Sequence, residues 1–198
     1  MKINLFALTG FGNIALKTLL KYKDINIVTL YTRKETDCFP YYDEEQLDSL
    51  AQKNNIDVKY IKNDDDWDIK DSVDLNLIVT FHRVFKKSHL DKGTYNINIH
   101  PSLLPSYKGP TPTNWIIHNK EKECGISAHF VSEEVDSGDI IYQESFPLLQ
   151  QDDASLRKFL ALKSENIIHF IILNFPDYNT IESIYEQSSY ESFYKYKV

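Results

Sequence analysis

Short apolar runs and longer amphipathic stretches alternate along the chain. Runs rich in β-branched and aromatic residues predict strands, and apolar residues three or four positions apart predict helices. On this basis we expect seven strands, at residues 2–8, 25–31, 57–61, 75–80, 95–99, 125–131 and 140–147. We expect four helices, at residues 14–20, 43–53, 112–118 and 155–175.

The order of these elements predicts the fold class. Strands that alternate with helices are typical of an α/β protein with a doubly wound, mostly parallel sheet flanked by helices. The run Leu75–Thr80 is almost wholly apolar, as expected for a strand buried on both faces of such a sheet. Sheets of this class bind ligands beyond the carboxyl ends of their strands. We expect one domain over residues 1–198, of which residues 176–198 form a C-terminal tail rich in Tyr and Ser.

Composition and charge exclude several classes of protein. The 198 residues include 22 Lys and Arg against 29 Asp and Glu, which gives a net charge of −7. This acidic balance argues against non-specific binding of nucleic acid, which depends on basic residues that neutralise phosphates. The two cysteines are too few for a disulfide framework, and the six histidines and two cysteines show no metal-ligand spacing. The chain shows neither a signal peptide nor an apolar run long enough to span a bilayer, so we expect a cytoplasmic protein without a metal or a membrane partner.

A glycine turn joins the first predicted strand to the first predicted helix. The segment Gly10-Phe11-Gly12-Asn13 could hold an anion on its backbone N–H groups, because it opens a helix. The third glycine of the dinucleotide fingerprint is absent, and no acidic residue ends the second strand, so we do not expect a dinucleotide site. A tight turn that simply needs small residues is the structural alternative.

The strongest chemical signal lies where the strand at residues 95–99 ends. Asn98 and His100 are two positions apart and therefore project from the same side of a strand. An amide donor beside an imidazole suits carbonyl chemistry, because the amide stabilises a developing oxyanion and the imidazole exchanges protons near neutral pH. An isolated Asn-x-His pair is more often structural, so the interpretation depends on a partner elsewhere in the chain.

A candidate partner lies in the turn between the last two predicted strands. Asp136-Ser137-Gly138 places a carboxylate there, followed by a glycine that permits a positive φ. A carboxylate brought near His100 would orient its ring and stabilise its protonated form. The structural alternative is that Asp136 only caps the turn.

Several motifs occur in a fixed order in this part of the chain. They are Asn98-x-His100-Pro101-Ser102-Leu103-Leu104-Pro105, Lys108-Gly109-Pro110, Gly125-Ile126-Ser127-x-His129 and Asp136-Ser137-Gly138-Asp139-Ile140-Ile141. Together they resemble the folate-dependent formyltransferase family, whose members transfer a formyl group from 10-formyltetrahydrofolate to an amine. The clear match covers roughly residues 75–148, and the recurrence of several motifs in order makes it specific.

The resemblance implies three catalytic residues, Asn98, His100 and Asp136. Asn98 and His100 would polarise the formyl carbonyl and stabilise the tetrahedral intermediate. Asp136 would support His100 and help to relay the proton that the attacking amine loses. These roles agree with the chemistry expected from the residue types alone.

The resemblance also implies a cosubstrate, 10-formyltetrahydrofolate, and places its pterin. Backbone groups at Arg83, Val84 and Phe85 would contact the pterin, and the loop that contains Val135 would close its other side. Because folate and nucleotides are anionic, we expect a local basic patch, for which Arg83, Lys86, Lys87 and Lys108 are candidates. Residues expected to contact the amine substrate are Gly10, Gly12, Asn13, Tyr107, Gly109, Trp115 and His129, although His129 could equally serve the structure and Tyr107 or Trp115 could stack on a base.

The branches of the family differ in the amine that they formylate. The segments Gly109–Trp115 and Gln187–Lys197 resemble the sugar-nucleotide and methionyl-tRNA branches, and the acidic charge argues against tRNA. We therefore expect an amino sugar of a sugar nucleotide as the acceptor and no nucleic-acid partner. One alternative is glycinamide ribonucleotide, although the phosphate-holding serine of that branch is missing after Gly12. Others are a formyl-folate hydrolase and a non-catalytic binding relative. A homodimer is one expected state, although most members of the sugar-nucleotide branch continue beyond the position of Val198 to dimerise.

Overall fold

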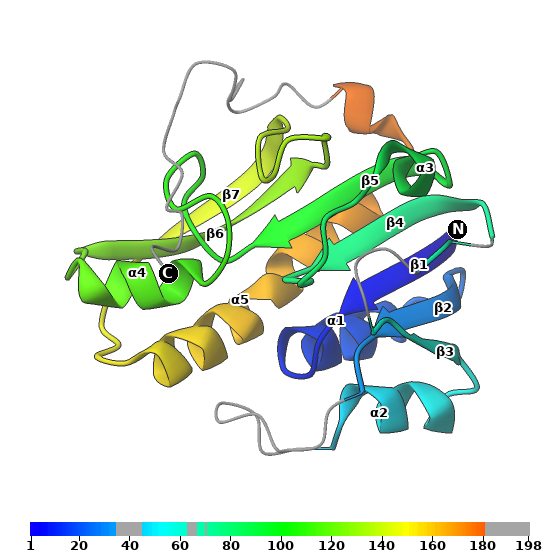
Figure 1. Ribbon diagram of the computed structural model, residues 1–198, viewed down its shortest axis with the longest axis horizontal. Coiled ribbons are helices and arrows are strands. Elements are labelled where there is room, and N and C mark those ends of the chain that lie inside the picture. The colour runs from blue at the N-terminus through cyan, green and yellow to red at the C-terminus, as the bar shows by residue number, and fades with distance from the viewer. Residues whose placement is uncertain (35–44, 63–66, 70, 181–198) are drawn as a thin grey trace. The chain divides into compact units, whose positions relative to one another are not determined.

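The computed structural model describes residues 1–34, 45–62, 67–69 and 71–180. The chain forms two compact units, Met1–Ile97 and Asn98–Val198. Seven strands follow the hydrogen-bonded order β3-β2-β1-β4-β5-β6-β7, with helices flanking them (Figure 1). The expected α/β class with a mostly parallel sheet is confirmed, whereas a single domain over residues 1–198 stays a prediction.

The N-terminal unit forms the parallel part of the sheet. Its elements are β1 (Lys2–Ala7), α1 (Phe11–Leu19), β2 (Asn26–Thr32), α2 (Leu47–Lys53), β3 (Asp57–Tyr60), β4 (Val73–Val79) and α3 (Lys87–Leu90). β1 pairs in parallel with β2 and with β4, and β2 pairs in parallel with β3. All residues of β4 except Asp74 are buried, which agrees with the burial on both faces expected for an apolar strand of a parallel sheet.

The C-terminal unit begins within β5 (Gly93–His100) and contains an antiparallel pair of strands. The elements that follow are α4 (Pro112–His118), β6 (Glu123–Phe130), β7 (Ile140–Pro147), α5 (Asp153–Leu173) and the 3₁₀ helix η1 (Asp177–Thr180). β6 and β7 pair antiparallel, with a register shift between Ala128 and His129. Helix α5 packs against β6 and buries Leu156, Leu160 and Ile167 along one side.

Several element boundaries differ from those expected from the sequence, and one helix was not expected at all. Helix α2 begins at Leu47 rather than at residue 43; residues 43 and 44 lie outside the described part of the chain. The four-residue helix α3 was not expected, because so short a helix shows no apolar periodicity. Helix α5 begins two residues early because the Asp152 carboxylate accepts a hydrogen bond from the Ser155 N–H at 2.8 Å, which caps the helix.

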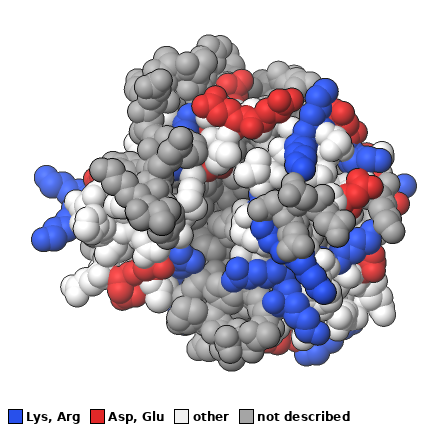
Figure 2. Space-filling model, viewed as in Figure 1, with Lys and Arg blue, Asp and Glu red and all other residues white. Residues whose placement is uncertain are grey.

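Two properties of the whole chain bear on its chemistry. Across the residues that the structure describes, no helix is both long and apolar enough to cross a membrane. Acidic and basic side chains share the face shown in Figure 2, so the net charge of −7 does not form one continuous acidic surface there. The tail segment Gln187–Lys197, on which part of the sequence resemblance rests, lies outside the described residues.

Candidate active site

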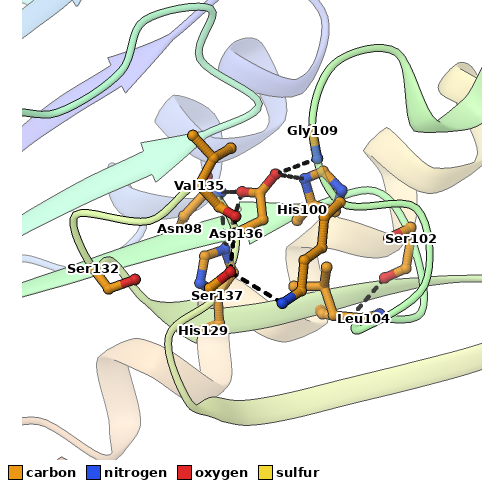
Figure 3. Close-up of polar contacts among 12 residues, drawn as sticks. Asn98, His100, Ser102, Leu104, Gly109, His129, Ser132, Val135, Asp136 and Ser137 are labelled. Atoms are coloured by element: carbon orange, nitrogen blue, oxygen red, sulfur yellow. Dashed lines mark hydrogen bonds and ion pairs between the residues drawn. The ribbon is translucent and has the colours of Figure 1, made fainter. Parts of the chain in front are cut away.

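The carboxyl end of β5 places two of the expected catalytic residues within the C-terminal unit. Asn98 and His100 lie two residues apart, and Pro101 follows where the strand ends. Figure 3 shows both side chains turned toward Asp136, which lies in the loop between β6 and β7. The two side chains therefore project from the same side of β5, as the two-residue period of a strand predicts.

Asp136 is the point at which these residues meet. Its Oδ1 accepts a hydrogen bond from Asn98 Nδ2 at 3.1 Å and lies 3.5 Å from His129 Nε2. Its Oδ2 accepts a hydrogen bond from the Gly109 N–H at 2.9 Å and lies 3.4 Å from His100 Nδ1. Both carboxylate oxygens are thus engaged, and the turn-capping alternative does not account for these four contacts.

The surroundings of Asp136 strongly favour its ionised form. Burial alone would raise the pKa of this carboxyl, whose side chain is only 10% exposed. The charge of His100, the contact with His129 and the hydrogen bond from Gly109 outweigh burial, and they lower the pKa of Asp136 well below its usual range. Asp136 is therefore a carboxylate at any physiological pH, suited to stabilise a neighbouring positive charge rather than to accept a proton.

The partners of His100 identify the ring nitrogen that can exchange a proton. Nε2 lies 2.9 Å from the backbone carbonyl oxygen of Tyr107. Because a carbonyl oxygen only accepts, we assign a hydrogen to Nε2. The second nitrogen, Nδ1, faces Asp136, so a proton gained there forms an ion pair with the carboxylate.

His129 belongs to the same cluster and is buried. Its Nε2 lies 3.1 Å from Asn98 Nδ2, and its Nδ1 lies 2.8 Å from the carbonyl oxygen of Phe130. The side chain is only 2% exposed. Of the two roles left open by the sequence, these distances support the structural one, and contact of His129 with the substrate stays a prediction.

The loop that carries Asp136 has an unusual backbone. Asp136 itself adopts a positive φ of 51°, which aspartate tolerates better than most residues. Gly138, which we expected to supply the positive φ, has a different reason to be glycine. A Cβ atom at Gly138 would lie 1.9 Å from the carbonyl oxygen of Phe130, so only glycine lets the loop approach the end of β6 so closely.

A buried hydrogen-bond network holds the turn after β5, and sequence reasoning missed it. Ser127 Oγ accepts hydrogen bonds from the Leu104 N–H at 3.1 Å and from Gln143 Nε2 at 2.8 Å, and donates to the Ser102 carbonyl at 2.7 Å. Gln143 Nε2 also donates to the Leu104 carbonyl at 2.9 Å. The available signal was a serine between the apolar residues Ile126 and Ala128 of strand β6.

Lys108 is another residue whose position the sequence did not indicate. It was a candidate for a local basic patch, and it is only 5% exposed. Its Nζ donates to Ser137 Oγ at 3.0 Å, and that hydroxyl donates to the Val135 carbonyl at 3.1 Å. Lys108 thus ties the segment that contacts His100 to the loop that carries Asp136. The other candidates Lys86 and Lys87 are exposed.

The glycine turn in the N-terminal unit is closed by its own side chains. Asn13 is fully buried; its Oδ1 accepts from the Gly10 N–H at 3.0 Å, and its Nδ2 donates to the Glu45 carbonyl at 2.9 Å. A Cβ atom at Gly12 would lie 2.4 Å from a methyl carbon of Leu47. These contacts support the structural alternative for the turn, and substrate binding by Gly10, Gly12 and Asn13 stays a prediction.

The residues expected near the pterin follow β4 in the N-terminal unit. Val84 is 61% exposed, whereas Phe85 is buried with its ring 4.9 Å from that of Phe6 and 5.2 Å from that of Trp67. Arg83 donates from Nη2 to the Lys62 carbonyl at 2.8 Å. The segment thus combines a buried aromatic anchor with an exposed neighbour beyond the carboxyl end of a parallel strand, where α/β proteins bind ligands.

The two aromatic residues proposed for base stacking differ in their surroundings. Tyr107 is 8% exposed, and its hydroxyl donates to Glu121 and accepts from Asn119 Nδ2, so its position argues against stacking. Trp115 is half-buried on α4, with its ring 5.8 Å from that of His118. Among the described residues, no group of His, Cys, Asp and Glu side chains is arranged to hold a metal ion.

The protein has a mostly parallel α/β sheet. An amide, an imidazole and a carboxylate lie together near the carboxyl end of β5, and such a set of groups suits acyl transfer. Comparison with known families makes the assignment specific. Residues 19–168, well over half of the chain, match the family described as Formyl transferase. The chain belongs to the formyl transferase family.

Individual relatives carry different names. A methionyl-tRNA formyltransferase of Azobacteroides pseudotrichonymphae is 34% identical over 109 residues, which make up 55% of this chain and 32% of that protein. The chain spans less than two thirds of the length of the curated relatives it matches.

Solved structures resemble the chain over more of its length. The structure of WlaRD, a sugar 3N-formyl transferase studied with dTDP and 5-N-formyl-THF, has a TM-score of 0.74 and 26% identity, and covers 98% of this chain and 69% of that one. Glycinamide ribonucleotide transformylase 1 of Symbiobacterium toebii has a TM-score of 0.69 at 21% identity, covering 89% of this chain and 88% of that one, a similarity of fold alone.

Proposed function

We propose that this chain transfers a formyl group from 10-formyltetrahydrofolate to the primary amine of an amino sugar carried by a nucleotide. The observation that carries the proposal is the contact of one buried carboxylate, Asp136, with both Asn98 and His100. Acyl transfer requires a group that moves a proton beside a charge that stabilises it, and this cluster supplies both. The sugar-nucleotide acceptor is supported by the similarity to WlaRD over nearly the whole chain and by the segment Gly109–Trp115.

The proposed reaction uses His100 and Asp136 in turn. The amine nitrogen attacks the formyl carbon, and the carbonyl electron pair moves to oxygen to give a tetrahedral intermediate. Nδ1 of neutral His100 takes the proton that the amine loses, and the resulting imidazolium is stabilised by Asp136 3.4 Å away. The same proton passes to N10 of the folate as the bond between the formyl carbon and N10 breaks, which releases tetrahydrofolate. The pterin contacts proposed for this step are backbone groups at Arg83, Val84, Phe85 and Val135.

A substitution of His100 tests the proton transfer. His100→Ala should lower turnover by about two to four orders of magnitude, because general acid–base groups contribute that much. Single-turnover formyl transfer would be measured beside His118→Ala, which removes an exposed histidine of the same unit. Near-normal turnover by His100→Ala, with a normal circular dichroism spectrum, would show that His100 is not the proton carrier.

A panel of acceptors tests the substrate. The chain would be incubated with 10-formyltetrahydrofolate and, separately, a dTDP-amino sugar, a UDP-amino sugar, glycinamide ribonucleotide, methionyl-tRNA or no acceptor. We expect formylation of an amino sugar nucleotide and negligible release of formate without an acceptor. Turnover of glycinamide ribonucleotide alone contradicts the sugar assignment, and acceptor-independent formate release identifies a hydrolase.

Methionyl-tRNA is the second candidate acceptor. It is favoured by the names of the curated relatives, of which one is 34% identical over 109 residues. The net charge of −7 argues against it, because binding to tRNA gains much of its free energy from basic residues. Formylation of methionyl-tRNA at physiological salt, with no reaction of the amino sugar nucleotides, would establish this alternative.

A further inference from the structure

The side-chain amide of Asn98 is held in one orientation. Its Nδ2 lies 3.1 Å from Asp136 Oδ1 and 3.1 Å from His129 Nε2. The reversed amide would instead place its oxygen 3.1 Å from the carboxylate oxygen, where two acceptors repel each other. Since Asp136 is ionised, the nitrogen must face it.

The hydrogen bonds of His129 complete this assignment. Its Nδ1 lies 2.8 Å from the carbonyl oxygen of Phe130, which only accepts, so in the neutral ring the hydrogen is on Nδ1. Nε2 then has a lone pair and accepts the second amide hydrogen of Asn98 (Figure 3). Because the ring of His129 is only 2% exposed, its packing leaves it little freedom to turn away.

These assignments leave the amide oxygen of Asn98 without a hydrogen-bond partner among the described residues. Both amide hydrogens are taken by Asp136 and His129, whereas Oδ1 is buried and has no hydrogen-bond partner among the residues that the structure describes. Buried polar atoms without partners are few in native proteins, and one beside the proposed reacting groups points to a ligand atom. The missing partner must be a hydrogen-bond donor, because an amide oxygen only accepts.

We propose that Asn98 Oδ1 accepts a hydrogen bond from an N–H of the attacking amine, and that His129 is the positioning residue that turns the amide to do so. The proposal deepens the proposed function and rests on it. A neutral primary amine has two N–H groups and one lone pair, so an N–H bound to Oδ1 leaves the lone pair free to face the formyl carbon. Asn98 then orients the nucleophile, and its amide hydrogens, which are taken by Asp136 and His129, are not available to stabilise the oxyanion.

A measurement without substrate tests the orientation. In the ¹⁵N-labelled full chain at neutral to alkaline pH, we expect a scalar coupling across the hydrogen bond between Asn98 Nδ2 and His129 Nε2. We also expect imidazole ¹⁵N shifts that place the hydrogen of His129 on Nδ1. The coupling should vanish in His129→Leu and persist in His118→Leu, which alters an exposed histidine on α4. A hydrogen found on His129 Nε2 would overturn the proposal.

A binding measurement tests the role of Oδ1. Calorimetry would compare an amino sugar nucleotide with its deoxy analogue, in which hydrogen replaces the amine. We expect the wild type to prefer the amine by about tenfold, because the analogue leaves a buried carbonyl unpaired. Asn98→Ala and His129→Leu should lose this preference. His129→Gln should recover part of it, because its side-chain carbonyl can accept the amide hydrogen of Asn98.

The outcomes separate this inference from the proposed function. If Asn98→Ala keeps the full preference for the amine, Oδ1 is not its acceptor and the inference is wrong. If the wild type binds neither nucleotide while the coupling is present, the proposed acceptor is wrong and the comparison moves to glycinamide ribonucleotide and its deamino analogue. If His129→Leu does not fold, Asn98→Ala and His129→Gln still decide the question.

Discussion

Asp136 has more influence on the site than any other single residue, because both of its carboxylate oxygens are engaged. It accepts hydrogen bonds from Asn98 and Gly109 and faces the ring nitrogens of His100 and His129. Removing its charge would therefore affect the orientation of an amide, the contacts of two imidazole rings and the position of a loop at once.

The lowered pKa of Asp136 predicts a specific dependence of stability on pH. Because its pKa is lower in the folded chain than in the unfolded chain, its contribution is complete above about pH 4 and is lost as the pH falls further. Below about pH 4, the unfolding free energy of the wild type should fall by up to about 1.4 kcal/mol per pH unit more than that of Asp136→Asn. Urea unfolding from pH 2.5 to 7 measures this difference.

Glu133→Gln is the matched control for this experiment, since it removes an exposed carboxylate from the same loop and leaves the contacts of Asp136 in place. It should retain the acid slope of the wild type. Parallel curves for the wild type and Asp136→Asn would contradict the lowered pKa. Asp136→Asn should also lose formyl transfer by at least about two orders of magnitude, because the imidazolium of His100 loses its counter-ion.

The hydrogen bond between Lys108 and Ser137 should contribute to stability as a pair. Lys108→Met keeps the aliphatic stem and removes the donor, and Ser137→Ala removes its acceptor. In a double-mutant cycle of unfolding free energies we expect a coupling of about 1–2 kcal/mol, as for a buried hydrogen bond to a charged group. Additive effects of the two substitutions would show that the contact does not stabilise the loop.

At the scale of secondary-structure elements, the sequence predicted best where the pattern is local. The strand at 140–147 and the helix at 112–118 have the bounds that were expected, because alternation and helical spacing are visible within each segment. Helix α3 was missed because one turn gives no repeat, and the β6 register shift at His129 was missed because it depends on pairing with β7.

The junction between β6 and the Asp136 loop provides a test at this scale. Gly138→Ala would place a Cβ atom 1.9 Å from the carbonyl oxygen of Phe130, so the loop must move away from β6. We expect a loss of about 1–3 kcal/mol in unfolding free energy, together with a fall in activity. Ser132→Ala, at the start of the same loop, removes only the Oγ hydrogen bond to the Glu134 carbonyl and should change stability by less than about 0.5 kcal/mol. Equal effects of the two substitutions would contradict the steric argument.

At the scale of the whole molecule, the net charge of −7 and the pI near 5.4 predict how the chain behaves in mild acid. Near pH 5.4 the mutual repulsion between chains disappears, so solubility should pass through a minimum. The fold should persist there, because Asp136 stays ionised well below that pH. Solubility and far-ultraviolet circular dichroism measured from pH 4 to 8 would show the two effects separately; loss of the dichroism signal at pH 5.4 would contradict the prediction.

The sequence alone determined the fold class and the identity of Asn98, His100 and Asp136 as a candidate cluster. It could do so because strand alternation, glycine turns and motif order are local properties of the chain. A cytoplasmic location, a homodimer and the identity of the amine remain predictions of the same sequence.

Only the tertiary structure decided which atoms of these residues are available. The orientation of Asn98 depends on His129 and Asp136, which are 31 and 38 positions away in the sequence, and the proton on His100 Nε2 depends on the carbonyl of Tyr107. No local pattern encodes such contacts, because a hydrogen bond is set by the distance and direction between two groups in the folded chain. The sequence thus identified the candidate side chains. The fold determined that, among the residues the structure describes, the oxygen of Asn98 is its atom without a hydrogen-bond partner.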